Sequence, residues 1–123
     1  MITLRLATVA DLESINDIYN HYILNTSITF DVEPWPIEKR INWFNRMAQN
    51  TRYLVMVAYH DHQVIGFAYN GAYNSKAAYN HSTELTVYKA PNCAIKGVGR
   101  ALYKRLFSQL KQLEFHRAYA LIT

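Results

Sequence analysis

The chain has 123 residues, 50% of them hydrophobic, which is enough for one sizeable core and too short for two domains of ordinary size. Thirteen Lys and Arg against nine Asp and Glu give a formal net charge of +4, which suits an anionic partner without choosing between a phosphorylated cofactor, a nucleic acid and a lipid surface. The sequence shows no signal peptide and no stretch near the roughly 18 apolar residues of a membrane span, and its one cysteine, Cys93, suits a reducing compartment, so we expect one cytoplasmic domain over residues 1–123.

The spacing of apolar residues predicts a strand and two helices in the first half of the chain. Residues 2–6, ITLRL, alternate apolar and polar side chains as a half-buried strand does. Thr8 is a candidate helix N-cap with Asp11 in capping-box position, and apolar residues at helical spacing then predict a helix over residues 9–24. After a loop or short extended piece, a second helix is expected to begin at Pro36, since proline is favoured in the first turn.

The second half of the chain predicts three strands, a helix and a last strand. Residues 53–71 read as two strands joined at the turn HDHQ, and residues 82–88 as a third, because all are rich in branched and aromatic residues. A helix is expected after a glycine pair, to about residue 113, and residues 117–123 form the final strand. This order predicts a mixed α/β domain, in which helices pack against one mixed sheet.

Gly97 and Gly99, in the segment IKGVGRAL, lie between a predicted strand and a predicted helix. Glycine lets an anion approach the main chain closely, and the N–H groups at the start of the helix would point at that anion. Lys96 and Arg100 add positive charge beside it. From the spacing alone, a purely geometric role of the two glycines in a strand-to-helix turn is slightly favoured over an anion-binding role. The segment has neither the Gly-Lys-Ser/Thr of a Walker motif nor the glycine spacing of a Rossmann turn, so another phosphate-bearing ligand is implied.

The segment VYKAPNCAIKGVGRALYKRL, residues 87–106, resembles the acetyl-CoA loop of the GNAT superfamily of N-acetyltransferases. The blocks IYNHYILNTSITFD and YNGAYNSKAAYNHSTELTVY are similar to one branch of it, the phosphinothricin and methionine sulfoximine acetyltransferases. The resemblance covers residues 2–123 and implies a GNAT-like acyl-CoA N-acyltransferase fold. Because chains of this family continue past the strand that ends here, the resemblance also implies that the domain is C-terminally shortened at Thr123.

The resemblance implies that acetyl-CoA binds as a co-substrate and that no metal is needed. The Gln or Arg that opens the family's loop falls at Ala94, and the glycine expected next to it falls at Ile95, so part of the pyrophosphate cradle is replaced. The implied cofactor-binding residues are Val87, Tyr88, Lys89, Ile95, Lys96, Gly97, Val98, Gly99 and Arg100.

Glu84 lies in the middle of the predicted strand STELTVY, where glutamate is disfavoured. An exposed sheet face is the ordinary reason for such a residue, and from the residues alone it is the favoured one. The family's general-base glutamate aligns with Glu84, and a base is needed because only a neutral amine attacks a thioester. The resemblance further points to main-chain N–H groups near Val87 and Tyr88 as donors to the oxyanion, and to substrate contacts at Asn74, Lys76, Tyr79 and Val87.

These observations lead to a cytoplasmic, acetyl-CoA-dependent N-acetyltransferase that acts on the amino group of a small amino-acid-like substrate of the phosphinothricin or methionine sulfoximine type. We expect a homodimer with no nucleic-acid or membrane partner. The alternative is a truncated, non-catalytic GNAT-like domain that serves as a CoA-binding or protein-interaction module. His60 and His62 at the predicted turn are more simply solvated turn residues than metal ligands.

Overall fold

The computed structural model describes residues 2–25, 33–49, 53–72, 82–91, 93–111 and 117–122. The elements follow the predicted order of strand, helix, helix, three strands, helix and strand, with a 3-10 turn, η1, ahead of the first helix. They are β1 (Thr3–Leu6), η1 (Val9–Asp11), α1 (Leu12–Asn25), α2 (Ile37–Ala48), β2 (Val55–His60), β3 (Gln63–Ala72), β4 (Ser82–Lys89), α3 (Val98–Lys111) and β5 (Arg117–Ile122).

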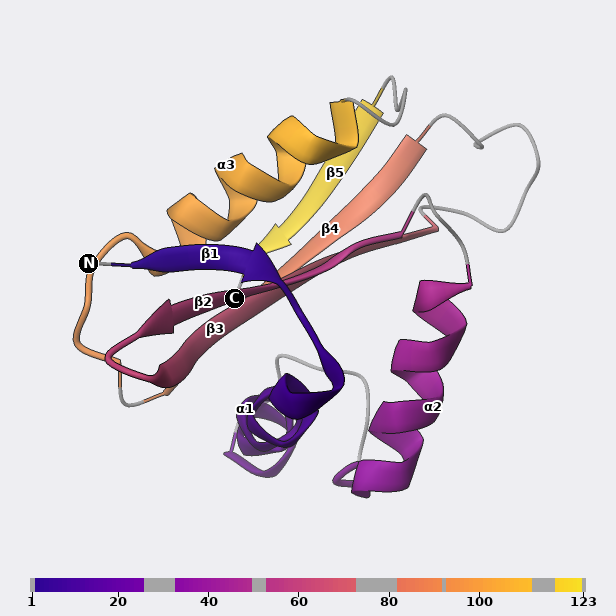
Figure 1. The fold of residues 1–123 in the computed structure, drawn as a ribbon, viewed down its shortest axis with the longest axis vertical. Helices are drawn as coiled ribbons and strands as arrows, with labels where there is room; N and C mark the ends of the chain where they lie inside the picture. Colours follow the sequence, from indigo (N-terminus) through magenta and orange to yellow (C-terminus); the bar gives the residue numbers. More distant parts are fainter. Residues whose placement is uncertain are drawn as a thin grey trace.

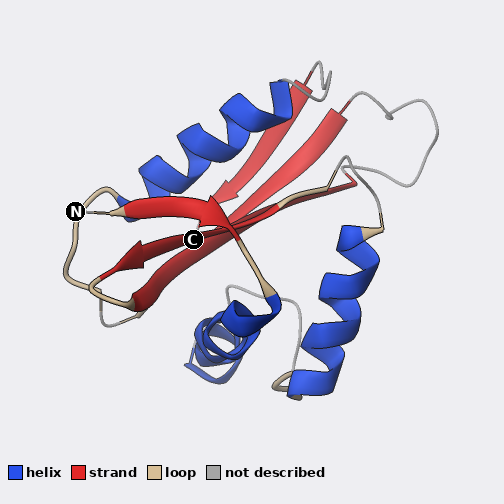
Figure 2. Cartoon of the chain, in the orientation of Figure 1, coloured by secondary structure: helices blue, strands red, loops and turns tan. Residues whose placement is uncertain are grey.

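The strands form one mixed sheet in the order β1-β2-β3-β4-β5. The pairs β1–β2, β2–β3 and β3–β4 are antiparallel, whereas β4 and β5 are parallel. A parallel pair needs a long crossover, and α3 supplies it. Figure 1 shows α3 along one side of the sheet and α1 and α2 on the other, and Figure 2 shows the same layers by element type. The predicted mixed α/β architecture is therefore confirmed.

The core beneath α3 explains why this segment is helical. Val98, Leu102, Leu106 and Leu110 recur at every fourth position and are at most 1% exposed, so they form one apolar stripe on the helix. This stripe packs against buried residues of β2, β3 and β4, which are Met56, Ala58, Ile65, Ala68, Leu85 and Val87.

A second core lies on the opposite face of the sheet, beneath α1. Its buried members from α1 are Leu12, Ile15, Ile18, Tyr19 and Ile23, again at helical spacing, and those from the sheet are Val55, Val57, Phe67 and Tyr88. Because strand side chains alternate between faces, Val87 and Tyr88 belong to different cores.

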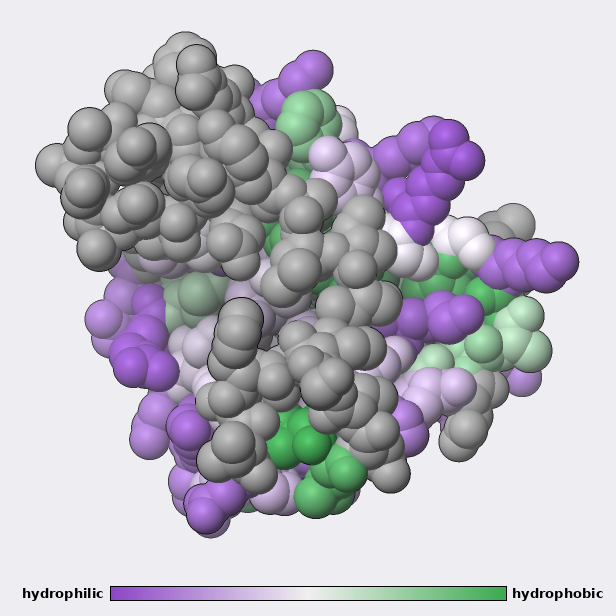
Figure 3. Space-filling model, turned by 180° about the vertical axis from the view of Figure 1, so that it is seen from behind, coloured by the Kyte–Doolittle hydropathy of each residue, from purple (hydrophilic) through white to green (hydrophobic). Residues whose placement is uncertain are grey.

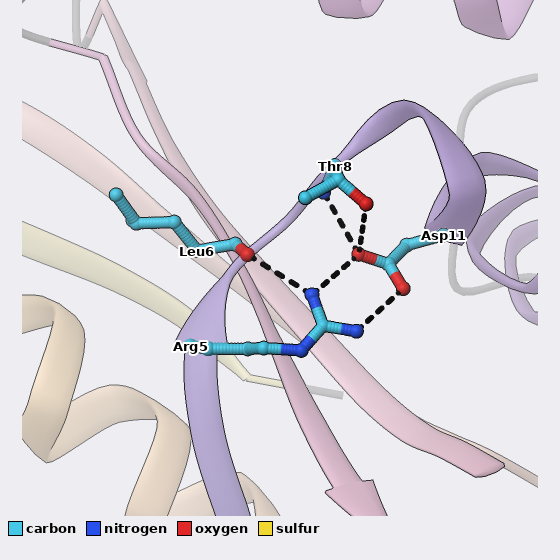
Figure 4. A network of polar contacts seen from close by, with 4 residues as sticks. All are labelled: Arg5, Leu6, Thr8 and Asp11. Carbon is cyan, nitrogen blue, oxygen red and sulfur yellow. Dashed lines mark hydrogen bonds and ion pairs between the residues drawn. The ribbon is translucent and has the colours of Figure 1, made fainter. Parts of the chain in front are cut away.

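The corner between β1 and α1 is held by a buried carboxylate (Figure 4). The two Nη atoms of Arg5 donate to the two carboxylate oxygens of Asp11 at 2.8 and 2.9 Å, and the Thr8 N–H donates to Asp11 Oδ2 at 2.8 Å. Asp11 thus occupies the capping-box position that the sequence predicts, and it satisfies a main-chain donor at the start of the helix.

A buried arginine joins α1 and α2. The Arg40 side chain is 2% exposed, and its Nε donates to Asn16 Oδ1 at 3.1 Å. The guanidinium carbon lies 4.6, 4.1 and 4.7 Å from the ring centroids of Tyr19, Trp35 and Trp43. Stacking on aromatic faces lets a guanidinium lie in the interior, because the rings attract its charge as its water is removed.

The turn between β2 and β3 is a tight hairpin at Asp61 and His62, which have φ angles of 54° and 64°. Positive φ at both central residues defines a type I′ turn, whose twist matches that of the strands it connects. The predicted hairpin at HDHQ is therefore confirmed.

The described surface carries scattered large apolar side chains, those of Leu6, Val9, Leu24 and Ile37. On the face drawn in Figure 3, green apolar areas lie between purple hydrophilic side chains. No helix in the described ranges is long and apolar enough to cross a membrane.

Candidate functional site

The glycine turn ahead of α3 is open. Gly97 has a φ of +83°, in the left-handed region that side chains rarely adopt. A Cβ built on Gly97 would meet no atom within 4 Å. The main chain at this turn is therefore accessible, as a cradle for an anion requires.

The start of α3 supplies donors next to this turn. The first hydrogen bond of the helix runs from the Ala101 N–H to the Gly97 carbonyl at 2.9 Å, so the N–H groups of the residues between them have no partner within the helix. The helix dipole favours negative charge at this end. The side chains of Lys96 and Arg100 are exposed beside it. Main-chain donors and two cations thus surround the open turn.

Val98 fixes the start of α3 on the sheet. Its side chain is 1% exposed, and a Cβ built on Gly66 of β3 would lie only 3.0 Å from Val98 Cγ1. That Cβ would also lie 3.0 Å from the carbonyl oxygen of Tyr88. The absence of a side chain at Gly66 therefore lets the helix start lie close to the end of β4.

The last two residues of β4 pair with β3 but lie beyond the described pairing of β4 with β5. The β3–β4 register continues to Gly66 and Lys89, whereas the β4–β5 register runs from Ser82 and Arg117 to Val87 and Ile122. As whole residues, main chain included, Val87 and Tyr88 are 0% and 3% exposed. The end of β4 is therefore almost completely covered at these two positions.

Glu84 lies in the middle of β4, and its Cα pairs with Gly71 of β3 and with Tyr119 of β5. Its side chain lies outside the described part of the chain. The predicted substrate residues Asn74, Lys76 and Tyr79 also lie outside the described residues. The backbone position of Glu84 within the sheet is thus defined, whereas its role as a base and the amine site stay predictions.

The two residues that depart from the family pattern, Ala94 and Ile95, have different surroundings. Ile95 and Cys93 are partly buried and pack against the core beneath α3, while Ala94 is exposed. The Cys93 N–H donates to the Ala90 carbonyl at 3.1 Å. The Ile95 side chain thus anchors the loop, and any contact with a phosphate at this position would have to come from its main chain.

The structure also adds residues that the sequence did not suggest. Tyr22 of α1 donates from its hydroxyl to the carbonyl of Lys89 at 2.5 Å, and Gly66 gives α3 its close approach. Helical spacing identified Tyr22 only as a core residue, and a glycine in a strand is typical of close backbone approach without saying to what. Within the described ranges, no group of three or more His, Cys, Asp and Glu could hold a metal ion.

Comparison with known proteins identifies the family. The family model described as "Acetyltransferase (GNAT) domain" matches residues 4–123. The chain is 40% identical to a phosphinothricin N-acetyltransferase of Streptomyces coelicolor, over 89% of this chain and 66% of that protein. It is 41% identical to an N-acetyltransferase of Streptomyces griseus, over 92% of this chain and 61% of that protein. The chain therefore spans just under two thirds of the length of these relatives.

A solved structure gives the same result for the fold. It is a GNAT superfamily phosphinothricin acetyltransferase from Sinorhizobium meliloti in complex with AcCoA, with a TM-score of 0.90 and 33% identity. The match covers 97% of this chain and 64% of that one. Together, the family match and the shared fold show that this chain belongs to the GNAT acetyltransferase family.

Proposed function

We propose that this chain is an acetyl-CoA-dependent N-acetyltransferase that acts on the amino group of a small amino-acid-like substrate of the phosphinothricin or methionine sulfoximine type. The observation that carries the proposal is the open, left-handed turn at Gly97 ahead of α3. The name of the Streptomyces coelicolor relative supports a substrate of the phosphinothricin type, and the AcCoA complex of a similar structure supports the co-substrate. The proposal includes a homodimer in the cytoplasm.

The residues around the turn fit a diphosphate. Main-chain N–H groups from Val98 to Arg100 donate to its oxygens, and the Lys96 and Arg100 side chains offset its charge. Bound acetyl-CoA supplies an acetyl group activated as a thioester. The main chain at the end of β4 holds and orients this arm and donates to the developing oxyanion near Val87 and Tyr88.

Glu84 acts as the general base. An α-amino group with a pKa of about 7.7 to 8 is only about one tenth neutral at pH 7, and the neutral form is the nucleophile. Glu84 takes the amine proton, directly or through water, as the nitrogen–carbon bond forms and the carbon–sulfur bond breaks. The thiolate leaves with the electron pair of that bond.

The first test is calorimetric titration of the purified chain with acetyl-CoA. We expect a Kd in the micromolar range for the wild type and loss of binding in Gly97→Glu, because a carboxylate would occupy the open turn and repel phosphate. Ser108→Glu places the same charge on the exposed side of α3 and should bind as the wild type does. Lys96→Glu serves as a second variant without strain at a left-handed residue, and circular dichroism verifies that each variant is folded.

The second test concerns the base. We expect Glu84→Gln to lower kcat by about 10²- to 10⁴-fold, because the amide cannot accept the proton, while the Kd for acetyl-CoA is unchanged. Glu38→Gln, an exposed change in α2, should leave kcat unchanged. Steady-state kinetics with acetyl-CoA and an amino-acid-like amine measures both. An unchanged rate in Glu84→Gln would refute the mechanism.

The alternative function is a non-catalytic module. It is favoured by Ala94 and by the packing of Ile95 against the core, which replace part of the pyrophosphate cradle. A folded wild-type chain that binds no acetyl-CoA would support this alternative over the enzyme.

A further inference from the structure

A hydrogen bond ties the first helix to the end of the strand on which the proposed cofactor lies. The Tyr22 hydroxyl of α1 donates to the Lys89 carbonyl of β4 at 2.5 Å, although the two residues are 67 positions apart in sequence. Lys89 is the last residue of β4. The bond therefore acts where the strand stops and the chain turns toward the glycine loop.

Aromatic packing fixes the direction of this hydroxyl. The rings of Tyr22 and Tyr88 lie with centroids 5.3 Å apart. The Tyr22 ring also lies edge-on to His21, with centroids 5.4 Å apart, and the Tyr88 ring is itself held by Tyr19 and Phe67. A ring held among other rings has little freedom to turn its oxygen elsewhere, so Tyr22 presents a preorganised donor to Lys89.

Near its end, β4 is also held by contacts with β3 and α3. The Tyr88 carbonyl lies over Gly66, where a Cβ would come within 3.0 Å of it, and the start of α3 lies beside it at Val98. The next residue but one, Ala90, donates its N–H to the Ile65 carbonyl at 2.8 Å. From the α1 side of the sheet, the contact that fixes the end of β4 is the hydrogen bond of the Tyr22 hydroxyl.

We propose that Tyr22 is a positioning residue for acetyl-CoA: its hydroxyl holds the Lys89 carbonyl and thereby sets the main chain of residues 87–89 against which the thioester arm lies. The inference rests on the proposed function and adds to it a residue of α1 that acts through the main chain of Lys89. It predicts that the loss of one hydroxyl in α1 weakens binding of the co-substrate.

The hydroxyl suits this task at neutral pH. Burial raises the pKa of Tyr22 above its ordinary value, so the group stays protonated and remains a donor. Removing it leaves the Lys89 carbonyl without this hydrogen bond, and a hydrogen bond of this kind typically corresponds to about a threefold to tenfold change in an equilibrium constant.

The test compares Tyr22→Phe with Tyr103→Phe. Each variant loses one phenolic oxygen, and the Tyr103 ring lies on α3, packed against Phe107, with no hydrogen bond of its hydroxyl recorded among the described residues. We expect Tyr22→Phe to raise the Kd and KM for acetyl-CoA about threefold to tenfold and to lower kcat as well, because the same main chain donates to the developing oxyanion. Hydrogen exchange should also become faster at the amides of residues 88–90, whereas Tyr103→Phe should match the wild type in all of these measurements.

Each outcome decides one part of the inference. Faster exchange without a change in Kd would show that Tyr22 is merely structural and overturn its role in binding. Unchanged exchange in Tyr22→Phe would overturn the positioning itself. If the wild type binds no acetyl-CoA, the proposed function fails and the cofactor role of Tyr22 fails with it, while the exchange data still show whether the hydroxyl holds the strand.

Discussion

Asp11 shows how one buried carboxylate can organise a corner of the molecule. Its side chain is 3% exposed, and it accepts hydrogen bonds from both Nη atoms of Arg5 and from the Thr8 N–H. Burial alone would raise the pKa of Asp11, but the hydrogen bonds from Arg5 and Thr8 outweigh it, so the pKa lies below its ordinary value. The ionised form is therefore the one that stabilises the fold.

This linkage predicts acid sensitivity. Because the pKa is lower in the folded chain, the stabilisation is fully present above the unfolded pKa of about 3.9 and is lost as the pH falls through the folded value. We expect Asp11→Asn to lower the free energy of unfolding by about 1 to 3 kcal/mol at pH 7, with a smaller difference from wild type at pH 3. Urea unfolding at both pH values measures this.

Asp17 provides the control, since it is an exposed aspartate on α1. Asp17→Asn should change the free energy of unfolding by less than about 0.5 kcal/mol. A difference between Asp11→Asn and wild type that is equally large at pH 3 and pH 7 would show that the ionised carboxylate is not the stabilising species.

At the scale of elements, the contact between α3 and β3 sets how closely the start of α3, and the glycine turn before it, approach the sheet. Gly66 lies beneath the first turn of α3, and a Cβ there would also come within 3.1 Å of Leu102 Cδ1. Contacts this short require the helix or the strand to move, because packed interiors leave little free space.

We expect Gly66→Ala to lower the free energy of unfolding by about 1 to 3 kcal/mol through overpacking and to raise the Kd for acetyl-CoA, because the start of α3 must shift. Gly71→Ala is the matched change in the same strand, where a Cβ would meet no atom within 4 Å, and its stability should stay within about 0.5 kcal/mol of wild type. Chemical unfolding and calorimetry measure both quantities. Equal stability of the two variants would refute the packing argument.

For the whole molecule, the order and type of the elements could be predicted because each buries one regular face. Leu102, Leu106 and Leu110 follow the helical period, and the strand STELTVY alternates between two cores at Val87 and Tyr88. Periods of this kind are local in sequence, so a single chain reveals them. The glycine turn and the place of Glu84 in a strand were predictable for the same reason.

Other features depend on pairs of residues that are far apart in sequence. Arg40 reads as a surface residue of a helix, yet it lies buried against Asn16 and three rings. The hydroxyl of Tyr22 finds its acceptor 67 positions away. Propensity and periodicity contain no information on such pairs, since tertiary packing decides them. The strand order of the sheet was unpredicted for the same reason.

The parallel pairing of β4 with β5 has a consequence for biosynthesis. A growing polypeptide can close the β2–β3 hairpin as soon as β3 has followed the two-residue turn. By contrast, β4 gains its parallel neighbour only after all of α3 and then β5 have been made. The α3 helix must therefore be translated before β4 is paired on both of its edges. In vectorial synthesis, the glycine turn therefore leaves the ribosome while one edge of β4 is still unpaired.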